Sequence, residues 1–172
     1  MRLRYSSMSK LTPHQASGVS PRVVLFFATG FGVGYLPRLP GTAGTLLAVP
    51  LSLGLNALAS ISLPIALLTL AAAICCAIWL SSGAALILER RDPQVIVIDE
   101  IVGFMLANFM APRNVMLLGV AFLLFRFFDI AKVYPLSRLE KLPGGAGIVL
   151  DDVMAGLYVF AILRLIPSGG LL

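Results

Sequence analysis

The sequence predicts an all-α, multi-pass membrane protein with about five or six helices and re-entrant loops rich in glycine and proline. Apolar residues make up 59% of the 172-residue chain, and charged residues only 12%. A soluble domain carries about 25% charged residues. No Asp, Glu, Lys, Arg or His lies between Arg38 and Glu89. A soluble protein of this length could not bury so much apolar surface, whereas a bilayer covers it.

Six apolar segments are the predicted elements. They are Val23–Leu36, Thr45–Ala59, Ile61–Leu88, Val95–Ala111, Asn114–Ala131 and Ile148–Ile166. A membrane-spanning helix needs roughly 20 residues, and Ile61–Leu88 exceeds this length. The others are close to the lower limit. Val23–Leu36 is too short to cross, so we expect it to enter the membrane and return, or to insert only in part.

The sequence divides into a short tail and one domain. Residues 1–22 are predicted to be a basic, mobile tail without the apolar core of a signal peptide, and residues 23–172 to be one membrane-embedded domain. The net charge of +5 does not indicate nucleic-acid binding, because the basic residues form no dense run with interleaved aromatics. Cys75 and Cys76 are adjacent in an apolar run and are expected to be small packing residues.

Basic residues favour one orientation in the membrane. If the N-terminus is cytoplasmic, counting the crossings places Arg90, Arg91, Lys132, Arg138 and Lys141 on the cytoplasmic side. Only Arg113 and Arg164 then fall on the far side, in agreement with the positive-inside rule.

Five acidic residues lie in or beside apolar segments, where an unpaired charge is costly and usually marks a functional site. They are Asp99, Glu100, Asp129, Asp151 and Asp152. The same topology places all five near the cytoplasmic ends of their helices. Clustered carboxylates repel one another unless a cation holds them, and an all-oxygen site suits Mg²⁺. Structural ion pairing is an alternative for Asp129, which lies three residues from Arg126 and from Lys132.

Two glycine-rich stretches precede apolar runs. Gly41, Thr42, Gly44 and Thr45 open one run, where exposed backbone N–H groups and the helix dipole favour an anion such as phosphate. The stretch 143–147 repeats this pattern just before Asp151. Flexible loops or helix packing explain either stretch equally well.

Other phosphatase chemistries lack their residues. The one histidine, His14, lies in the tail, which excludes a histidine nucleophile. The chain contains no D-x-D-x-T sequence and no nucleotide-binding P-loop. Carboxylate-bound metal is the chemistry that remains.

Four segments resemble the conserved blocks of the phosphatidylglycerophosphatase A family. They are GFGVGYLPRLPGTAGTLLAVP (30–50), VIDEIVGFML (97–106), FRFFDIAKVYP (125–135) and PGGAGIVLDDVMAG (143–156). The resemblance implies an Mg²⁺-dependent enzyme of the bacterial inner membrane whose site faces the cytoplasm. It implies hydrolysis of phosphatidylglycerophosphate to phosphatidylglycerol. No protein partner is implied.

The resemblance also implies site roles. Asp99, Glu100, Asp151 and Asp152 would hold one or two Mg²⁺ ions, and Asp99, Asp129 and Asp152 would be catalytic. The expected phosphate-binding residues are Arg126, Lys132, Gly41, Thr42, Gly44 and Thr45. Either water or a carboxylate could be the nucleophile. The alternative function is a small ion-coupled transporter, which predicts acids spread through the bilayer and an internal repeat.

Overall fold

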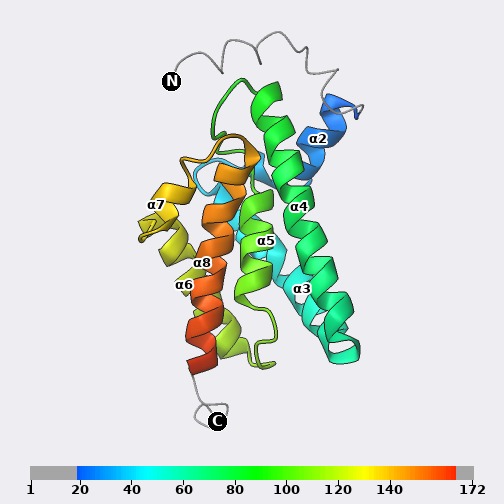
Figure 1. Cartoon of the computed structure of the whole chain (residues 1–172), viewed down its shortest axis with the longest axis vertical. Helices are drawn as coiled ribbons and strands as arrows, with labels where there is room; N and C mark the ends of the chain where they lie inside the picture. Colours follow the sequence, from blue (N-terminus) through cyan, green and yellow to red (C-terminus); the bar gives the residue numbers. More distant parts are fainter. Residues whose placement is uncertain (1–18, 166–172) are drawn as a thin grey trace.

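The computed structural model describes residues 19–165, and within this range it contains seven α-helices and no strand. The predicted all-α class is therefore confirmed (Figure 1). Residues 1–18 of the expected tail lie outside the described residues, whereas Pro21 already begins the first described helix. The elements are α2 (Pro21–Ala28), a 3-10 turn η1 (Val33–Tyr35), α3 (Pro40–Ile61), α4 (Leu63–Ile87), α5 (Ile98–Ala107), α6 (Val115–Ala131), α7 (Leu136–Leu139) and α8 (Gly145–Leu165).

Three of these helices, α3, α4 and α8, are long and apolar enough to cross a membrane. They contain 22, 25 and 21 residues, and at 1.5 Å per residue they are about 32–38 Å long. A bilayer's hydrocarbon core is about 30 Å thick. Their outer surfaces carry exposed leucines such as Leu46 and Leu68, as expected for helices that face lipid.

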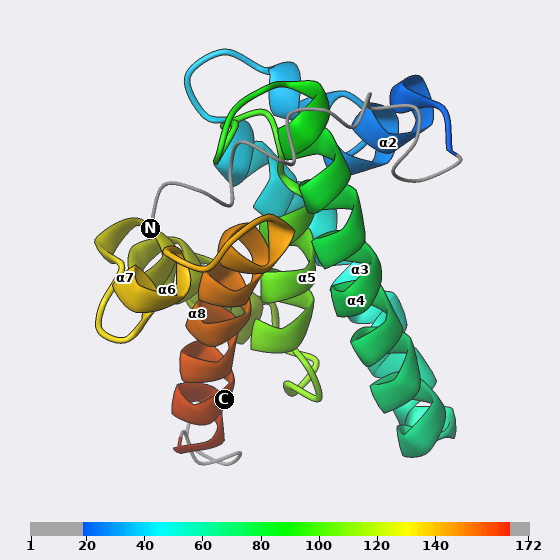
Figure 2. The same cartoon turned by 45° about the horizontal axis from the view of Figure 1, so that its top comes forward.

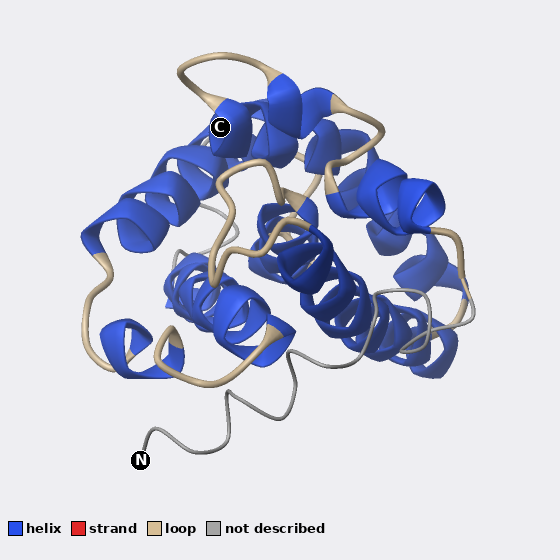
Figure 3. Ribbon diagram, turned by 90° about the horizontal axis from the view of Figure 1, so that it is seen from above, coloured by secondary structure: helices blue, strands red, loops and turns tan. Residues whose placement is uncertain are grey.

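Helix α5 is short and central. It packs against α3, α4, α6 and α8, and most of its ten residues are buried. Its length is about 15 Å, half of the hydrocarbon thickness. Figure 3 shows the helices of the bundle from above. The expected spanning segment Val95–Ala111 is thus a buried half-length helix.

The backbone carbonyls of the turn that follows α5, residues 108–110, accept hydrogen bonds from side chains of other helices. Asn56 of α3 donates a hydrogen bond to the Asn108 carbonyl at 2.8 Å. The Arg164 guanidinium of α8 donates to the carbonyls of Phe109 and Met110, at 2.7 and 2.8 Å. Backbone carbonyls at membrane depth must be satisfied within the protein, and these side chains allow α5 to end there.

Successive helices run up and down through the bundle, as Figures 1 and 2 show. The N-terminal ends of α3, α5 and α8 therefore lie at the same end as the C-terminal end of α6. This arrangement brings together the four sequence segments that carry the predicted site residues.

Helices α5 and α8 approach closely through two glycines. A Cβ on Gly156 of α8 would lie 2.2 Å from the Gly103 carbonyl oxygen of α5. A Cβ on Gly103 would lie 2.8 Å from the Asp152 carbonyl oxygen. Small residues permit such close helix contacts in membrane proteins, and here they set the spacing between the two acidic helices.

Candidate active site

Three carboxylates form the centre of the site. Asp99 and Glu100 occupy the first turn of α5, and Asp152 faces them from α8. One carboxylate oxygen from each residue lies within 4.8 Å of the others. Asp99 and Asp152 are buried. Acids in a first helical turn are stabilised by the helix dipole, which explains the position of the α5 pair.

The glycine contact explains why these acids meet. Gly103 follows Asp99 by one helical turn, and Gly156 follows Asp152 by one turn. Residues four apart lie on the same helix face. The face that carries the acid on each helix is therefore also the face that packs most closely, and the two carboxylates meet one turn above the contact.

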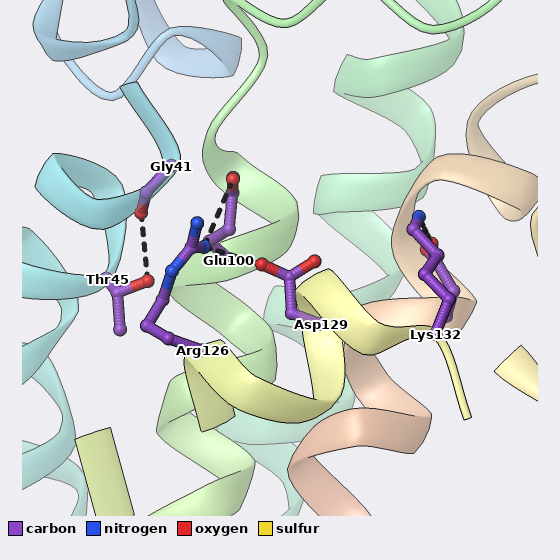
Figure 4. Close-up of polar contacts among 7 residues, drawn as sticks. Gly41, Thr45, Glu100, Arg126, Asp129 and Lys132 are labelled. Carbon is purple, nitrogen blue, oxygen red and sulfur yellow. Dashed lines mark hydrogen bonds and ion pairs between the residues drawn. The ribbon is translucent and has the colours of Figure 1, made fainter. Parts of the chain in front are cut away.

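Arg126 and Asp129 of α6 lie beside this centre (Figure 4). The Arg126 Nη1 atom is 2.6 Å from Asp129 Oδ2 and 3.7 Å from Glu100 Oε1. The ion pair expected from the three-residue spacing therefore forms. Arg126 therefore lies between Asp129 and Glu100 and holds Asp129 beside the carboxylate centre.

Lys132 and Asp151 form a second polar group at the edge of the site. Lys132 donates a short hydrogen bond to Asp151, and its Nζ atom lies 3.7 Å from Glu140 Oε2. Burial lowers the pKa of Lys132, but the hydrogen bond and charge of Asp151, with the charge of Glu140, outweigh burial and raise it. Lys132 is therefore a cation at neutral pH.

The structure separates the adjacent pair on α8. Asp151 was expected to be a fourth metal ligand, but its carboxylate faces Lys132, and it is not among the residues whose oxygens converge. Asp152 alone represents α8 in the carboxylate centre.

The first glycine-rich stretch lies at the site. Gly41, in the first turn of α3, lies so close to Glu100 that a Cβ would be 2.1 Å from Glu100 Oε1 and 3.0 Å from Arg126 Nη1. No side chain caps this helix end. The Thr45 hydroxyl donates to the Gly41 carbonyl at 2.9 Å, and Gly44 packs against Val97. Thr42, in the first turn, is partly buried.

The second glycine-rich stretch has a packing role. The Gly145 N–H donates to the Ser82 hydroxyl of α4 at 2.8 Å, and a Cβ on Gly145 would lie 2.1 Å from the Ile78 carbonyl oxygen. A Cβ on Gly147 would lie 2.3 Å from the Leu142 carbonyl oxygen. Gly145 lets α8 begin against α4, and Gly147 lets it begin close to the preceding loop; the three atoms nearest to each of these Cβ positions include no carboxylate oxygen.

The carboxylate centre fits a hard divalent cation. Among the described residues, the buried oxygens Asp99 Oδ1 and Glu100 Oε2 have no hydrogen-bond partner. A buried charged oxygen without a partner is costly, and a metal ion would satisfy both atoms. Carboxylate oxygens with room for water and phosphate are typical ligands of Mg²⁺. Arg126 and the uncapped start of α3 lie beside the centre and suit a phosphate group.

Comparison with known proteins identifies the family. The family model of phosphatidylglycerophosphatase A matches residues 26–167. This chain belongs to that family. A phosphatidylglycerophosphatase A of Haemophilus influenzae is 36% identical, covering 78% of this chain and 85% of the relative. The Escherichia coli protein of the same name is 32% identical, covering 81% of this chain and 80% of the relative.

A third relative has a different name. It is a Bacteroides thetaiotaomicron protein, named as a suggested phosphatidylinositol-3-phosphatase, which is 37% identical and covers 81% of this chain and 90% of its own length. No solved structure matches the chain. Family membership makes this member a phosphatase that acts on a phosphate monoester, and it does not support the transporter alternative.

Two residues important for the site were not predicted from the sequence. Gly103 and Gly156 set the distance between the acidic helices, although neither was singled out. The available signal was a glycine four residues after an acid, which occurs after Asp99 and again after Asp152.

Proposed function

We propose that the protein hydrolyses phosphatidylglycerophosphate to phosphatidylglycerol and inorganic phosphate, with Mg²⁺ as its cofactor. The observation that carries this proposal is the centre formed by Asp99, Glu100 and Asp152. In it Asp99 Oδ1 and Glu100 Oε2 have no hydrogen-bond partner, and Glu100 lies beside Arg126. The names of two relatives support the choice of lipid.

In this mechanism Asp99, Glu100 and Asp152 would hold the metal. Bound Mg²⁺ supplies Lewis acidity at the phosphoryl oxygens. Arg126 neutralises charge on the same group, and Lys132 does so from the other side, since Asp151 and Glu140 keep it charged and oriented. Asp129, positioned by Arg126, accepts a proton from the attacking water. The water oxygen bonds to phosphorus as the ester P–O bond breaks, and Asp129 returns the proton to the lipid oxygen, which leaves as the alcohol.

The position of the site suits a lipid substrate. Glu100 lies in the first turn of α5, close to the start of α3 at Gly41 (Figure 4), where a headgroup can meet it. The acyl chains of the same molecule remain beside the apolar outer surfaces of the long helices. A phosphatase of a membrane lipid gains from this arrangement because its substrate never has to leave the bilayer.

Phosphate release by purified protein tests this function. Phosphatidylglycerophosphate and phosphatidylinositol 3-phosphate should be compared in the same detergent micelles, each with and without Mg²⁺. We expect release from the first lipid only, and only with the metal. Faster release from phosphatidylinositol 3-phosphate would contradict the proposed substrate but not the proposed reaction. Release without a metal would contradict the proposed role of Mg²⁺.

We also propose that the protein resides in the bacterial inner membrane with its site facing the cytoplasm. In the topology predicted from the sequence, the end of the bundle that carries the site has four basic residues, Arg90, Arg91, Arg138 and Lys141. Arg164 lies at the opposite end, in agreement with the positive-inside rule. Single cysteines at Ser137 and Arg113, both exposed, can be tested with an impermeant thiol reagent on intact cells lacking Cys75 and Cys76. Ser137→Cys should stay unlabelled and Arg113→Cys should react. The reverse pattern would invert the topology.

A further inference from the structure

Helix α2 exposes an apolar face on the outside of the protein. Val24 and Ala28, four residues apart, are buried against Leu80 and Ala84 of α4. The other side of the helix carries Val23, Phe26 and Phe27, and Phe31 and Tyr35 follow it in the next turns. All five are between 43% and 58% exposed. A helix side that faced water would be polar.

The exposed phenylalanines form one preassembled patch. The rings of Phe26, Phe27 and Phe31 pack edge to face, with centroid separations of 5.2, 5.5 and 5.7 Å. We call Val23, Phe26, Phe27, Phe31 and Tyr35 the aromatic face. Contiguous apolar patches of this kind mark an interaction surface.

The location of the aromatic face indicates what covers it. Helix α2 has eight residues, about 12 Å, so it cannot cross a bilayer. It packs on the part of α4 that includes Leu80 and Ala84, near the site end (Figure 2). The face is therefore continuous with the lipid-facing surface of a spanning helix, at the level where that surface meets the headgroups.

Basic residues on either side of the aromatic face are consistent with a position at the level of the headgroups. Arg22 and Arg38 flank it in the sequence, and both are exposed. Neither forms a salt bridge among the described residues. Aromatic and basic side chains gather together at the membrane–water interface, where rings meet the acyl boundary and cations meet phosphates.

We propose that the aromatic face is a lipid-docking surface, which lies in the plane of the membrane and inserts into the interfacial layer of the bilayer. Its occupant is phospholipid, and it does not pair with a second copy of this chain. The docked segment is attached to the site, because the Val97 N–H donates to the Ala28 carbonyl at 3.0 Å. Val97 precedes Asp99 by two residues, so docking also fixes the height of the carboxylate centre relative to the headgroups.

Depth-dependent fluorescence quenching tests this placement without measuring activity. Phe31→Trp is made in a Trp79→Phe background and reconstituted in phosphatidylcholine–phosphatidylglycerol vesicles. Ala72→Trp in the same background is the deep control, because Ala72 is exposed near the middle of α4. We expect lipids brominated near the ester end of the acyl chain to quench Phe31→Trp most. Lipids brominated near the methyl end should quench Ala72→Trp most.

Three results would overturn the proposal. Quenching of Phe31→Trp by aqueous iodide but not by brominated lipid would place the face in water. Strongest quenching by bromine near the methyl end would place it in the bilayer centre. Protection from every quencher would show that protein, such as a second copy of the chain, covers it.

A second experiment measures what docking does, and it rests on the proposed function. The triple variant Phe26→Ser, Phe27→Ser, Phe31→Ser is compared with the triple leucine variant, which keeps the face apolar. With lipid substrate in vesicles, we expect the serine variant to raise KM about tenfold and the leucine variant to change it little. In detergent micelles both should match the parent protein.

An unchanged KM of the serine variant in vesicles would contradict a docking role. If the parent protein does not hydrolyse the chosen lipid at all, the proposed function fails, and the quenching experiment still decides whether the face docks.

Discussion

The two pairs of adjacent acids look alike in the sequence but differ in the folded protein. Asp99 and Glu100 both reach the carboxylate centre from the first turn of α5. Asp151 and Asp152 lie further along α8, beyond its first turn. Asp152 turns to the centre, and Asp151 turns to Lys132.

Successive side chains are about 100° apart in both helices, so the difference arises from the elements that surround each pair. The first turn of α5 has a neighbour on each side, α3 through Gly41 and α8 through Asp152. Both acids of the pair therefore lie in the carboxylate centre. The interior of α8 has α5 on one side and the α6–α7 region on another, so its pair is divided between two tasks. Metal binding and the contact with Lys132 can be distinguished by changing the members of the two pairs one at a time.

Removal of the metal should have the largest effect. If the α5 pair and Asp152 share a cation, treatment with EDTA followed by desalting should abolish phosphate release, since three close carboxylates cannot bind phosphate without it. Adding Mg²⁺ should restore the rate. Full activity of the chelated protein would show that the three acids serve another purpose.

Loss of one carboxylate from the centre should come next. Asp99→Asn or Asp152→Asn removes one ligand charge while keeping the shape, and should reduce kcat/KM by at least about 100-fold. Glu89→Gln, at an exposed acid just after α4 that forms no salt bridge among the described residues, is the control and should retain activity. Thermal unfolding in detergent should show that both site variants remain folded. If either one retains near-parental turnover, that residue does not hold the metal.

Separating the two acidic helices should have an intermediate effect. Gly156→Ala places a methyl group 2.2 Å from the Gly103 carbonyl oxygen, so α5 and α8 must move apart. Such overpacking costs about 1–3 kcal/mol, and we expect a lower unfolding temperature together with about tenfold weaker activation by Mg²⁺. Gly119→Ala on α6 has open space around it and is the matched control. Equal behaviour of the two variants would remove the glycine contact from the explanation.

Loss of Asp151, the acid of the α8 pair that contacts Lys132, should have the smallest effect. Asp151→Asn loses the ionic hydrogen bond to Lys132, while Glu140 remains near that lysine. A charge-assisted hydrogen bond contributes about 1.5–3 kcal/mol, so kcat/KM should fall by about tenfold, with unchanged dependence on Mg²⁺ concentration. A shift in metal dependence as large as that of Asp152→Asn would return Asp151 to the metal site.

Much of the site could be predicted because membrane helices obey simple counting rules. Apolar segment lengths and basic residues were enough to bring the five acids to one end of the bundle. The three-residue spacing of Arg126 and Asp129 also predicted their ion pair, because residues at that spacing are neighbours on a helix surface.

Other features depend on contacts that no local pattern specifies. The division of Asp151 from Asp152 depends on how α8 is rotated against α5, which Gly103 and Gly156 determine. The two glycine-rich stretches have similar composition, and only the neighbours of Gly41 and Gly145 show that one lies at the site and the other packs on α4. The short length of α5 depends on Asn56 and Arg164, which lie far away in the sequence.

The polar partners at the inner end of α5 have a consequence for how the protein responds to its membrane. Because α5 is enclosed and the carbonyls of the turn that follows it, residues 108–110, are satisfied by Asn56 and Arg164, its length is independent of lipid thickness. Hydrophobic mismatch therefore acts on α3, α4 and α8, which can tilt to accommodate it. The helix that carries Asp99 and Glu100 is insulated from that adjustment, so one set of site distances can operate in membranes with acyl chains of different lengths.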